Sequence, residues 1–210
     1  MTTLTLPLAL QGPMMAFGIG THEREKPTST TPTKSAVLGL VAAALGRTFT
    51  DPQDDLHALM LHVRVDDPGQ VQSDFQIVRQ ALRADGSVNP FLTPVRREYL
   101  YGAAFLVLLE GPAYILGSVG EALLNPAFPP YLGRRSCPPA RPLYVQAPKT
   151  AEPLTVMAEV PDLTGTGGRR LALIEDPLGY YTRPDQPLPE RRFANRTLTL
   201  THIQTVSAAP

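Results

Sequence analysis

The stretch AAFLVLLEGPAYILGSVGEALLN, residues 103–125, decides the fold. Residues 103–111 form a strongly apolar run of strand length, which predicts a β-strand. Residues 114–125 carry apolar side chains at helical spacing and stop before Pro126, which predicts an amphipathic helix. Together they supply the second half of a fold whose first half lies upstream.

The upstream residues predict a strand, a helix and a second pair of strands. Alternating leucines at positions 4, 6, 8 and 10 predict a half-buried strand. Residues 34–45 predict a helix, with Thr33 as its N-cap and Gly46 at its end. Three further features follow: a short helical stretch near residues 54–60, a hairpin of strands at 61–69 and 73–78, and an extended loop or protruding hairpin at 79–94.

The order strand–helix–strand–strand–helix predicts an α+β fold of the ferredoxin-like βαββαβ type, the topology of the RNA recognition module. We expect this domain to span residues 1–145, with a thumb insertion at about residues 79–98. Residues 146–210 predict a β-rich C-terminal subdomain that completes or extends the sheet, with strands at 153–160, 169–176 and 196–203.

The composition limits the class of protein. The chain has 210 residues, 43% hydrophobic and 18% charged, with 23 prolines and zero formal net charge, which is typical of a globular protein with long ordered loops. Zero net charge argues mildly against a free-standing nucleic-acid binder. Residues 26–50 and 126–150 lack Asp and Glu, so we expect one face to bind an anion and other faces to meet proteins. Without a signal peptide or an apolar run of about 18 residues, a cytoplasmic location is expected.

The sequence gives little support for an enzymatic or a metal-binding function. A Cys137 nucleophile would need a histidine partner, and no histidine lies in a recognisable signature. HEREK, residues 22–26, resembles the zinc motif H-E-x-x-H but has Lys26 in place of the second histidine. PTKSAVLG, residues 32–39, lacks the glycine of a nucleotide-binding loop. We therefore expect no catalytic residue, no metal and no cofactor, and interpret Cys137 as a packing residue.

The basic residues indicate a polyanion as ligand. Lys34 begins a predicted helix, where free N–H groups attract phosphate. Arginine binds phosphate through its planar fork and stacks on bases. Three arginine clusters stand out: Arg96 with Arg97, Arg134 with Arg135, and Arg191, Arg192 and Arg196. The aromatic candidates for stacking on unpaired bases are Phe17, Tyr99, Tyr101 and Tyr131.

Four segments occur in an order that resembles a known family. They are LALQGPMMAFG at 8–18, PTKSAVLGLVAAALG at 32–46, RREYLYGAAFLVLLEG at 96–111 and PYLGRRSCPP at 130–139. Together they resemble the CasD subunit family of the type I-E CRISPR Cascade complex, within the repeat-associated RNA-binding superfamily. Phe17 stands where tryptophan is common and Ala36 where glycine is common. In the C-terminal third, RRFANR at 191–196 is the segment that fits the family best.

The resemblance implies a modified ferredoxin-like RNA-binding fold with a protruding thumb hairpin between the strands at 61–66 and 103–111. It implies a subunit that does not cleave RNA, caps the 5′ handle of the guide RNA, and joins the Cascade backbone filament to the large subunit. Target DNA would be met through the assembled complex. The implied RNA-binding residues are Gln11, Gly12, Pro13, Met14, Phe17, Gly18, Lys34, Ser35, Arg96, Arg97, Tyr99, Arg134, Arg135 and Ser136.

Two alternatives from other classes stay open at this point. One is a metal-independent CRISPR repeat endoribonuclease, in which a histidine or tyrosine such as His22 or Tyr99 activates the 2′-hydroxyl. The other is a protein–protein adaptor whose arginines are ordinary surface residues. Within PYLGRRSCPP, the sequence leaves open which of Arg134 and Arg135 faces RNA and which braces the loop.

Overall fold

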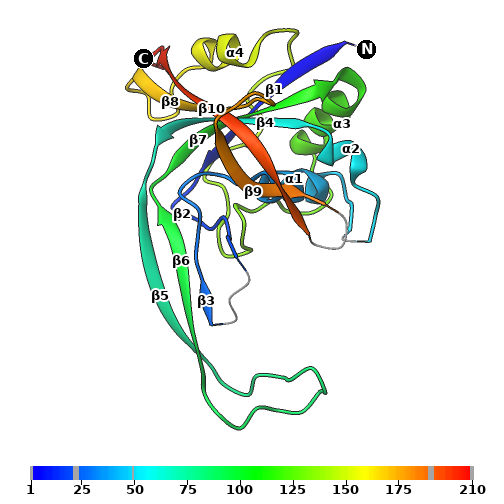
Figure 1. Cartoon of the computed structure of the whole chain (residues 1–210), viewed down its shortest axis with the longest axis vertical. Coiled ribbons are helices and arrows are strands. Elements are labelled where there is room, and N and C mark those ends of the chain that lie inside the picture. Colours follow the sequence, from blue (N-terminus) through cyan, green and yellow to red (C-terminus); the bar gives the residue numbers. More distant parts are fainter. Residues whose placement is uncertain (1, 21–23, 49, 189–191, 209–210) are drawn as a thin grey trace.

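The computed structural model describes residues 2–20, 24–48, 50–188 and 192–208. A six-stranded antiparallel sheet runs through the body of the protein, in the strand order β1-β7-β4-β8-β10-β9 (Figure 1). The strands are β1 (Thr3–Gln11), β7 (Ala104–Pro112), β4 (Met60–Asp67), β8 (Gly168–Glu175), β10 (Phe193–Thr205) and β9 (Tyr181–Pro187). The coarse prediction of a mixed α+β fold is confirmed.

Strand β7 lies between β1 and β4 and is covered on both of its faces. Phe105, Val107 and Leu109 point into a core shared with helices α1 (Lys34–Ala44) and α3 (Ala113–Leu124). Leu106 and Leu108 point to the opposite face, into a smaller core with helix α4 (Pro153–Glu159). This two-sided burial explains why residues 103–111 are apolar without alternation. The strand and the helix predicted from residues 103–125 are confirmed.

One prediction for the C-terminal third of the chain is wrong. Residues 153–160 were expected to form a strand, but they form helix α4. Pro153 stands at the first helical position, where its missing N–H costs nothing. Pro153, Val156, Met157 and Val160 are all buried, and their spacing is that of one helical face. The strands expected at 169–176 and 196–203 correspond to β8 and β10, whereas the proline-containing β9 was not expected.

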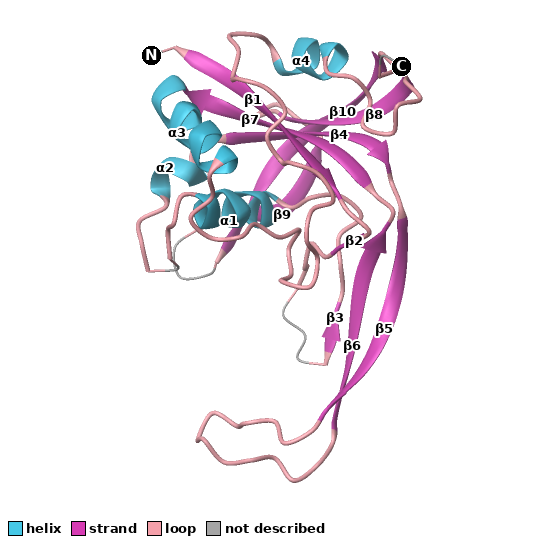
Figure 2. Cartoon of the chain, turned by 180° about the vertical axis from the view of Figure 1, so that it is seen from behind, coloured by secondary structure: helices cyan, strands magenta, loops and turns pink. Residues whose placement is uncertain are grey.

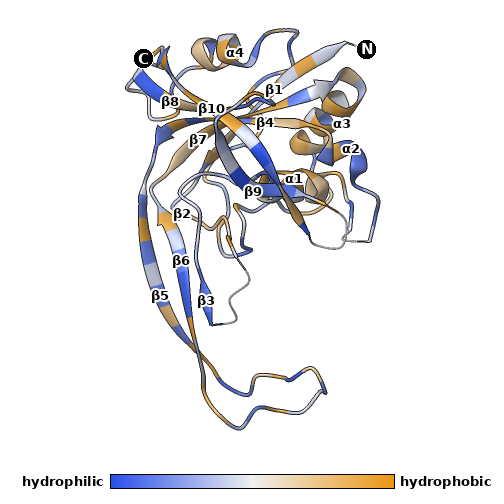
Figure 3. Cartoon of the chain, viewed as in Figure 1, coloured by the Kyte–Doolittle hydropathy of each residue, from blue (hydrophilic) through white to orange (hydrophobic). Residues whose placement is uncertain are grey.

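A second, smaller sheet carries a long hairpin away from the body (Figures 1 and 2). Its central strand β6 (Thr93–Tyr101) pairs on one side with β5 (Gln70–Val78), and on the other with the two-residue strands β2 (Met14–Met15) and β3 (Glu25–Lys26). The residues between β5 and β6 form the exposed tip. In Figure 3 apolar and polar residues alternate along β5, and Val71, Phe75 and Ile77 are 43%, 60% and 52% exposed.

The predicted hairpin of residues 61–69 with 73–78 is wrong in its pairing. Strand β5 pairs with β6 from Gln70 opposite Tyr101 to Val78 opposite Thr93, and β4 pairs with β7 and β8 instead. Both edges of β4 are therefore occupied, and β5 has to leave the central sheet. The chain makes this change at Gly69, whose φ of +64° is in the left-handed region. An added Cβ there would lie 2.5 Å from the carbonyl oxygen of Tyr101, so only glycine fits.

The segment after α3 returns along the free edge of β1. Backbone bonds join Ala9 N to Leu143 O at 2.8 Å and Lys149 N to Thr5 O at 3.0 Å. Residues 143–149 thus lie beside β1, and strands β8, β10 and β9 continue the same central sheet beyond β4. The proposed domain boundary near residue 145 stays a prediction. Among the described residues, no helix has the length and apolarity that a membrane span requires.

A fully buried arginine fastens α4 to the sheet. The guanidinium of Arg64 on β4 is 0% exposed and is paired with Asp66, with Nε at 2.6 Å from Oδ1 and Nη2 at 2.7 Å from Oδ2. Its remaining hydrogens are donated to the carbonyl oxygen of Met157 in the last turn of the helix and to those of the two residues that follow it, Val160 and Pro161. Arg64 therefore caps the C-terminus of α4, where a cation is favoured by the helix dipole.

We expect Asp66→Ala to lower the free energy of unfolding by about 3–5 kcal/mol, because it leaves the buried Arg64 cation without its carboxylate. Asp55→Ala is the matched control, since it breaks the partly exposed pair between Arg47 and Asp55 and such pairs contribute below about 1 kcal/mol. Urea unfolding of both variants measures the two values. Equal small losses would contradict the capping role of Arg64.

Candidate nucleic-acid interface

Most of the predicted RNA-binding residues gather where the hairpin joins the body. The glycine loop at 11–18, the base of β6 and the loop at 131–137 meet there around the small sheet of β2, β6 and β3. Within the glycine loop, Pro13 and Gly18 are exposed, while Gln11 and Met14 are half-buried. Gly12 is buried, and an added Cβ would lie 3.0 Å from Leu132 Cδ1. The loop at 131–137 is therefore packed directly onto the glycine loop.

The loop at 131–137 is held in one shape by backbone bonds. Leu132 N donates to Cys137 O at 2.7 Å, and Ala16 N donates to Leu132 O at 3.0 Å. Gly133 has a φ of +89°, and a Cβ there would lie 1.8 Å from the carbonyl oxygen of Ala16. Such close approach is possible only for glycine. Cys137 is buried, and burial raises the pKa of its thiol, so it packs the loop and is not an activated nucleophile.

The two arginines of this loop have different environments. The Cζ atom of Arg134 lies 4.8 Å from the centre of the Tyr99 ring, in a cation–π contact. Its guanidinium also donates to the carbonyl oxygens of Lys26, at 3.2 Å, and Glu98, at 3.4 Å. Arg134 thus ties the loop to β3 and β6. Arg135 and Ser136 are exposed, so Arg135 presents its charge to the solvent.

Two aromatic rings that were expected to stack on bases are buried. Phe17 is 1% exposed and packs edge-on against Phe105, with ring centres 6.2 Å apart. Tyr99 is 5% exposed and lies beneath Arg134. The expectation of an open stacking face at Phe17 is therefore corrected, because this ring fills the main core. Tyr131 at the edge of the loop is 37% exposed and keeps an accessible face.

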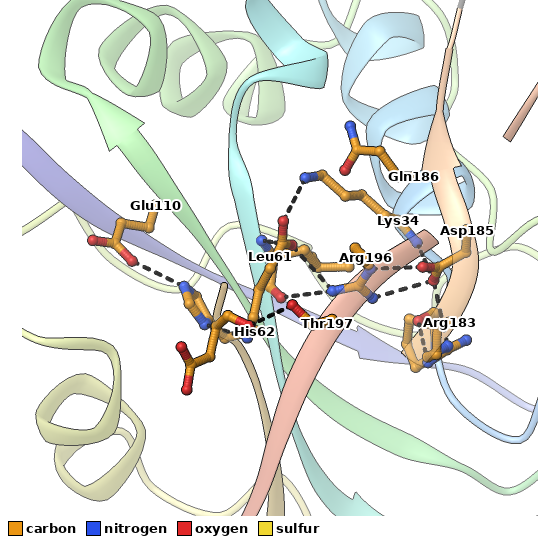
Figure 4. A network of polar contacts seen from close by, with 12 residues as sticks. Lys34, Leu61, His62, Glu110, Arg183, Asp185, Gln186, Arg196 and Thr197 are labelled. Carbon is orange, nitrogen blue, oxygen red and sulfur yellow. Dashed lines mark hydrogen bonds and ion pairs between the residues drawn. The ribbon is translucent and has the colours of Figure 1, made fainter. Parts of the chain in front are cut away.

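Lys34 is also turned inward, contrary to the expected phosphate contact. The residue is 2% exposed, and its Nζ donates to Glu175 Oε1 at 2.8 Å (Figure 4). Its backbone N–H donates to Asp185 Oδ2 at 3.1 Å, and the hydroxyl of Thr33 caps the helix by accepting from Ala36 N. Burial lowers the pKa of Lys34, although Glu175 opposes the shift. The positive charge at the start of α1 is thus neutralised by carboxylates of the protein itself. The half-buried Ser35 lies beside the cap.

The middle of β6, where it pairs with β3, carries further cations on the two faces of the small sheet. On β6, Arg96 is exposed and Arg97 is half-buried, and they lie opposite Glu25 and Lys26 of β3. The Nε of Arg97 is buried and has no hydrogen-bond partner among the described residues. We name Arg24, Lys26, Arg96, Arg97, Arg134 and Arg135 the basic cluster.

Sequence reasoning missed Arg24 and Lys26 as members of the basic cluster. Both lie in HEREK, which was weighed as a metal motif, although Lys26 begins an acid-free run. From the third predicted arginine cluster, Arg196 does not join the basic cluster, because it is 6% exposed and bonded to Asp185 and Glu175. Arg191 and His22 lie outside the described residues.

Comparisons with known proteins agree with this geometry over almost the whole chain. A family model described as CRISPR-associated protein (Cas_Cas5) matches residues 5–199. The CRISPR system Cascade subunit CasD of Escherichia coli (strain K12) is 32% identical over 212 residues, which cover 91% of this chain and 92% of that protein. A chain of a structure described as "Crystal structure of Cas protein" has a TM-score of 0.80 and 34% identity, covering 98% of this chain and 100% of its own. A chain of a "CRISPR RNA-guided surveillance complex" has a TM-score of 0.82 and 28% identity, covering 97% and 91%.

We expect Gly133→Ala to lower the free energy of unfolding by about 2 kcal/mol or more, since the left-handed backbone alone costs an L side chain about 1–2 kcal/mol and the loop must also move off Ala16. Gly39→Ala is the control, because an added Cβ there meets open space within α1 and should stabilise the helix by about 0.5–1 kcal/mol. Thermal or urea unfolding distinguishes the two. A Gly133→Ala protein as stable as the wild type would show that the loop is not held against Ala16.

Proposed function

This chain belongs to the CRISPR-associated protein (Cas_Cas5) family, and from that premise we propose that it is a non-catalytic guide-RNA-binding subunit of a type I-E CRISPR Cascade complex. The family resemblance read from the four sequence segments is confirmed. The observation that carries the RNA-binding role is the basic cluster at the junction of hairpin and body. Its exposed cations, Arg96 and Arg135 among them, stand on a backbone that Gly133 and Arg134 hold in place.

The topology supports a modified ferredoxin-like fold with a thumb. Along the chain, β1, α1, β4, β7 and α3 occur in the βαββα order, and β7 lies between β1 and β4. Residues 143–149 bond to the other edge of β1 and take the place of the last strand. The hairpin of β5 and β6 is inserted between β4 and β7, and we assign it as the thumb.

The basic cluster suits a single-stranded RNA handle. Arginine and lysine side chains at the surface neutralise phosphates, and backbone groups of the two loops fix the register of the RNA. Arg135 and Arg96 are the phosphate ligands in this scheme, whereas Arg134 braces the site through Tyr99 and the Lys26 carbonyl. The unstacked bases of the 5′ handle would then be read on their edges, with Tyr131 as the exposed stacking ring.

Other surfaces suit protein neighbours in the assembled complex. Large apolar side chains are exposed on α3, near β9 and at the start of β10, and a complex can bury them. They include Tyr114 at 67%, Leu178 at 93%, Tyr180 at 71% and Phe193 at 53% exposure. We propose the Cascade backbone subunit and the large subunit as these partners, with target DNA met through the assembled complex. Zero net charge fits a subunit that binds RNA on one face and protein on others.

The ribonuclease alternative gains little from the described residues. Tyr99 is buried beneath Arg134, a position that does not favour contact with a 2′-hydroxyl. His62 is 1% exposed, and its two ring nitrogens are bonded to Glu110 and to the backbone N–H of Glu175. Neither group therefore stands ready as a general base at the basic cluster.

We expect Arg135→Gln to reduce the guide RNA that co-purifies with the complex, without changing the melting temperature. The slope of log Kobs against log salt concentration should become shallower by about one, as for the loss of one phosphate contact. Arg134→Gln should lower both RNA content and melting temperature, because its cation–π and carbonyl contacts are structural. Arg169→Gln, an exposed arginine on β8, is the control and should change neither. Unaltered RNA content and salt slope in Arg135→Gln would contradict the proposed contact.

We expect no specific cleavage when the purified protein is incubated with repeat RNA in EDTA. Gel analysis of the labelled RNA measures this directly. Cleavage at one position, abolished by His22→Ala or Tyr99→Phe, would instead establish the endoribonuclease alternative.

A further inference from the structure

A buried ionic cluster joins the start of α1 to the C-terminal strands (Figure 4). Asp185 of β9 accepts from Arg196 Nε at 2.6 Å and from the backbone N–H of Lys34 at 3.1 Å. Glu175 of β8 accepts from Lys34 Nζ at 2.8 Å and from Arg196 Nη1 at 3.1 Å. Such a cluster is expensive to desolvate and weak evidence for stability, and a known use of buried charge is to fix one geometry. Arg183 of β9 is the fifth member of this ionic cluster, through its contact with Asp185.

Arg183 is the cation that reaches out of this cluster. Three cations, Lys34, Arg183 and Arg196, face two carboxylates, so one positive charge is in excess. The Nε of Arg183 lies 3.4 Å from Asp185, a longer contact than those of Arg196. Its terminal nitrogens point instead to the connecting segment, which we define as residues 26–33. They donate to Thr31 Oγ1 at 2.7 Å, to Ser29 Oγ at 3.0 Å and to Pro32 O at 3.5 Å.

The connecting segment in turn holds the proposed RNA-binding surface. Thr28 Oγ1 accepts from the backbone N–H of Phe17 at 2.9 Å, and Ser29 N donates to Phe17 O at 2.7 Å. Thr28 N donates to the Glu98 carboxylate on β6 at 3.1 Å. At the other end, Lys26 O accepts from Arg134 at 3.2 Å. The segment is thus bonded to the glycine loop, to the base of the hairpin and to the arginine loop.

We propose that Arg183 is a positioning residue for guide-RNA binding, which acts through Ser29 and Thr31 to hold the connecting segment, and with it the glycine loop and Lys26, in the RNA-binding geometry. This inference rests on the proposed function. Arg183 is 7% exposed and touches no RNA itself. Without it the hydroxyls of the segment lose a charged donor, and the RNA has to order the segment when it binds. The C-terminal strands β8–β10 thereby become part of the RNA-binding machinery.

The test uses the full chain reconstituted in its complex, with a single-stranded RNA oligonucleotide that carries the repeat-derived 5′ end of the guide. Arg183→Met should fold, because it leaves two cations facing two carboxylates in the cluster. We expect it to weaken RNA binding about tenfold, the cost of ordering one or two side chains. Ser29→Ala with Thr31→Val should weaken binding by a similar factor, and adding Arg183→Met to that pair should weaken it no further.

Two readouts and one control variant separate positioning from a general loss of stability. Hydrogen exchange at the amides of Phe17 and Ser29 should accelerate in Arg183→Met, and Arg183→Lys should restore part of the affinity. Arg170→Met is the control, since it breaks an ion pair with Asp162 far from the connecting segment and should leave RNA affinity unchanged. Wild-type RNA affinity in Arg183→Met would overturn the inference, and so would additive losses of affinity in the combined variant. In either case, a loss of RNA affinity in Arg135→Gln would still support the proposed function. Wild-type affinity in both Arg135→Gln and Arg183→Met would overturn both.

Discussion

The need to cover both faces of β7 governs the whole structure. Leu106 and Leu108 on one face and Phe105, Val107 and Leu109 on the other are fully buried, so a layer is required on each side of the sheet. Helices α1 and α3 supply one layer and α4 supplies the other. Because α4 needs its own anchor, Arg64 is buried at its C-terminus and paired with Asp66. The faces of the central sheet are thus occupied by helices, and binding is left to the loops and to the hairpin.

Local patterns in the sequence were enough for the elements around β7, but not for pairings that depend on distant residues. Residues 103–125 contain both the apolar run and the helical spacing, so β7 and α3 could be predicted without any partner. The pairing partner of β5 could not be predicted in this way, because it depends on β8, which occupies the second edge of β4. Helix α4 was mistaken for a strand because five hydrophobic residues within the eight positions 153–160 fit a short strand as easily as one helical face.

The candidate site shows the same difference between features that local sequence predicts and features that depend on distant residues. The glycine loop, β6 and the loop at 131–137 were named from the sequence, and the structure brings them together. Burial could not be read from residue type, however. Lys34 has the residue type and the position at a helix start that are typical of an anion site. However, Glu175 and Asp185, more than 140 residues away in the sequence, neutralise it. Arg134 and Arg135 are neighbours in sequence, and only the position of Tyr99 and the Lys26 carbonyl separates the brace from the exposed charge.

Zero net charge and RNA binding are compatible here because the charges are partitioned. In the buried pairs, Arg64 faces Asp66 and Arg196 faces Asp185, so these four charges are not presented at the surface. At the base of the hairpin, the Glu98 carboxylate is turned to the backbone N–H of Thr28 and does not pair with Arg96 beside it on β6. Electrostatic interactions at the surface are screened over about 8 Å at physiological salt. A phosphate at the basic cluster therefore responds to the charges within that range, Glu25 and Glu98 as well as the cations, and the sum over the chain has little influence on its binding.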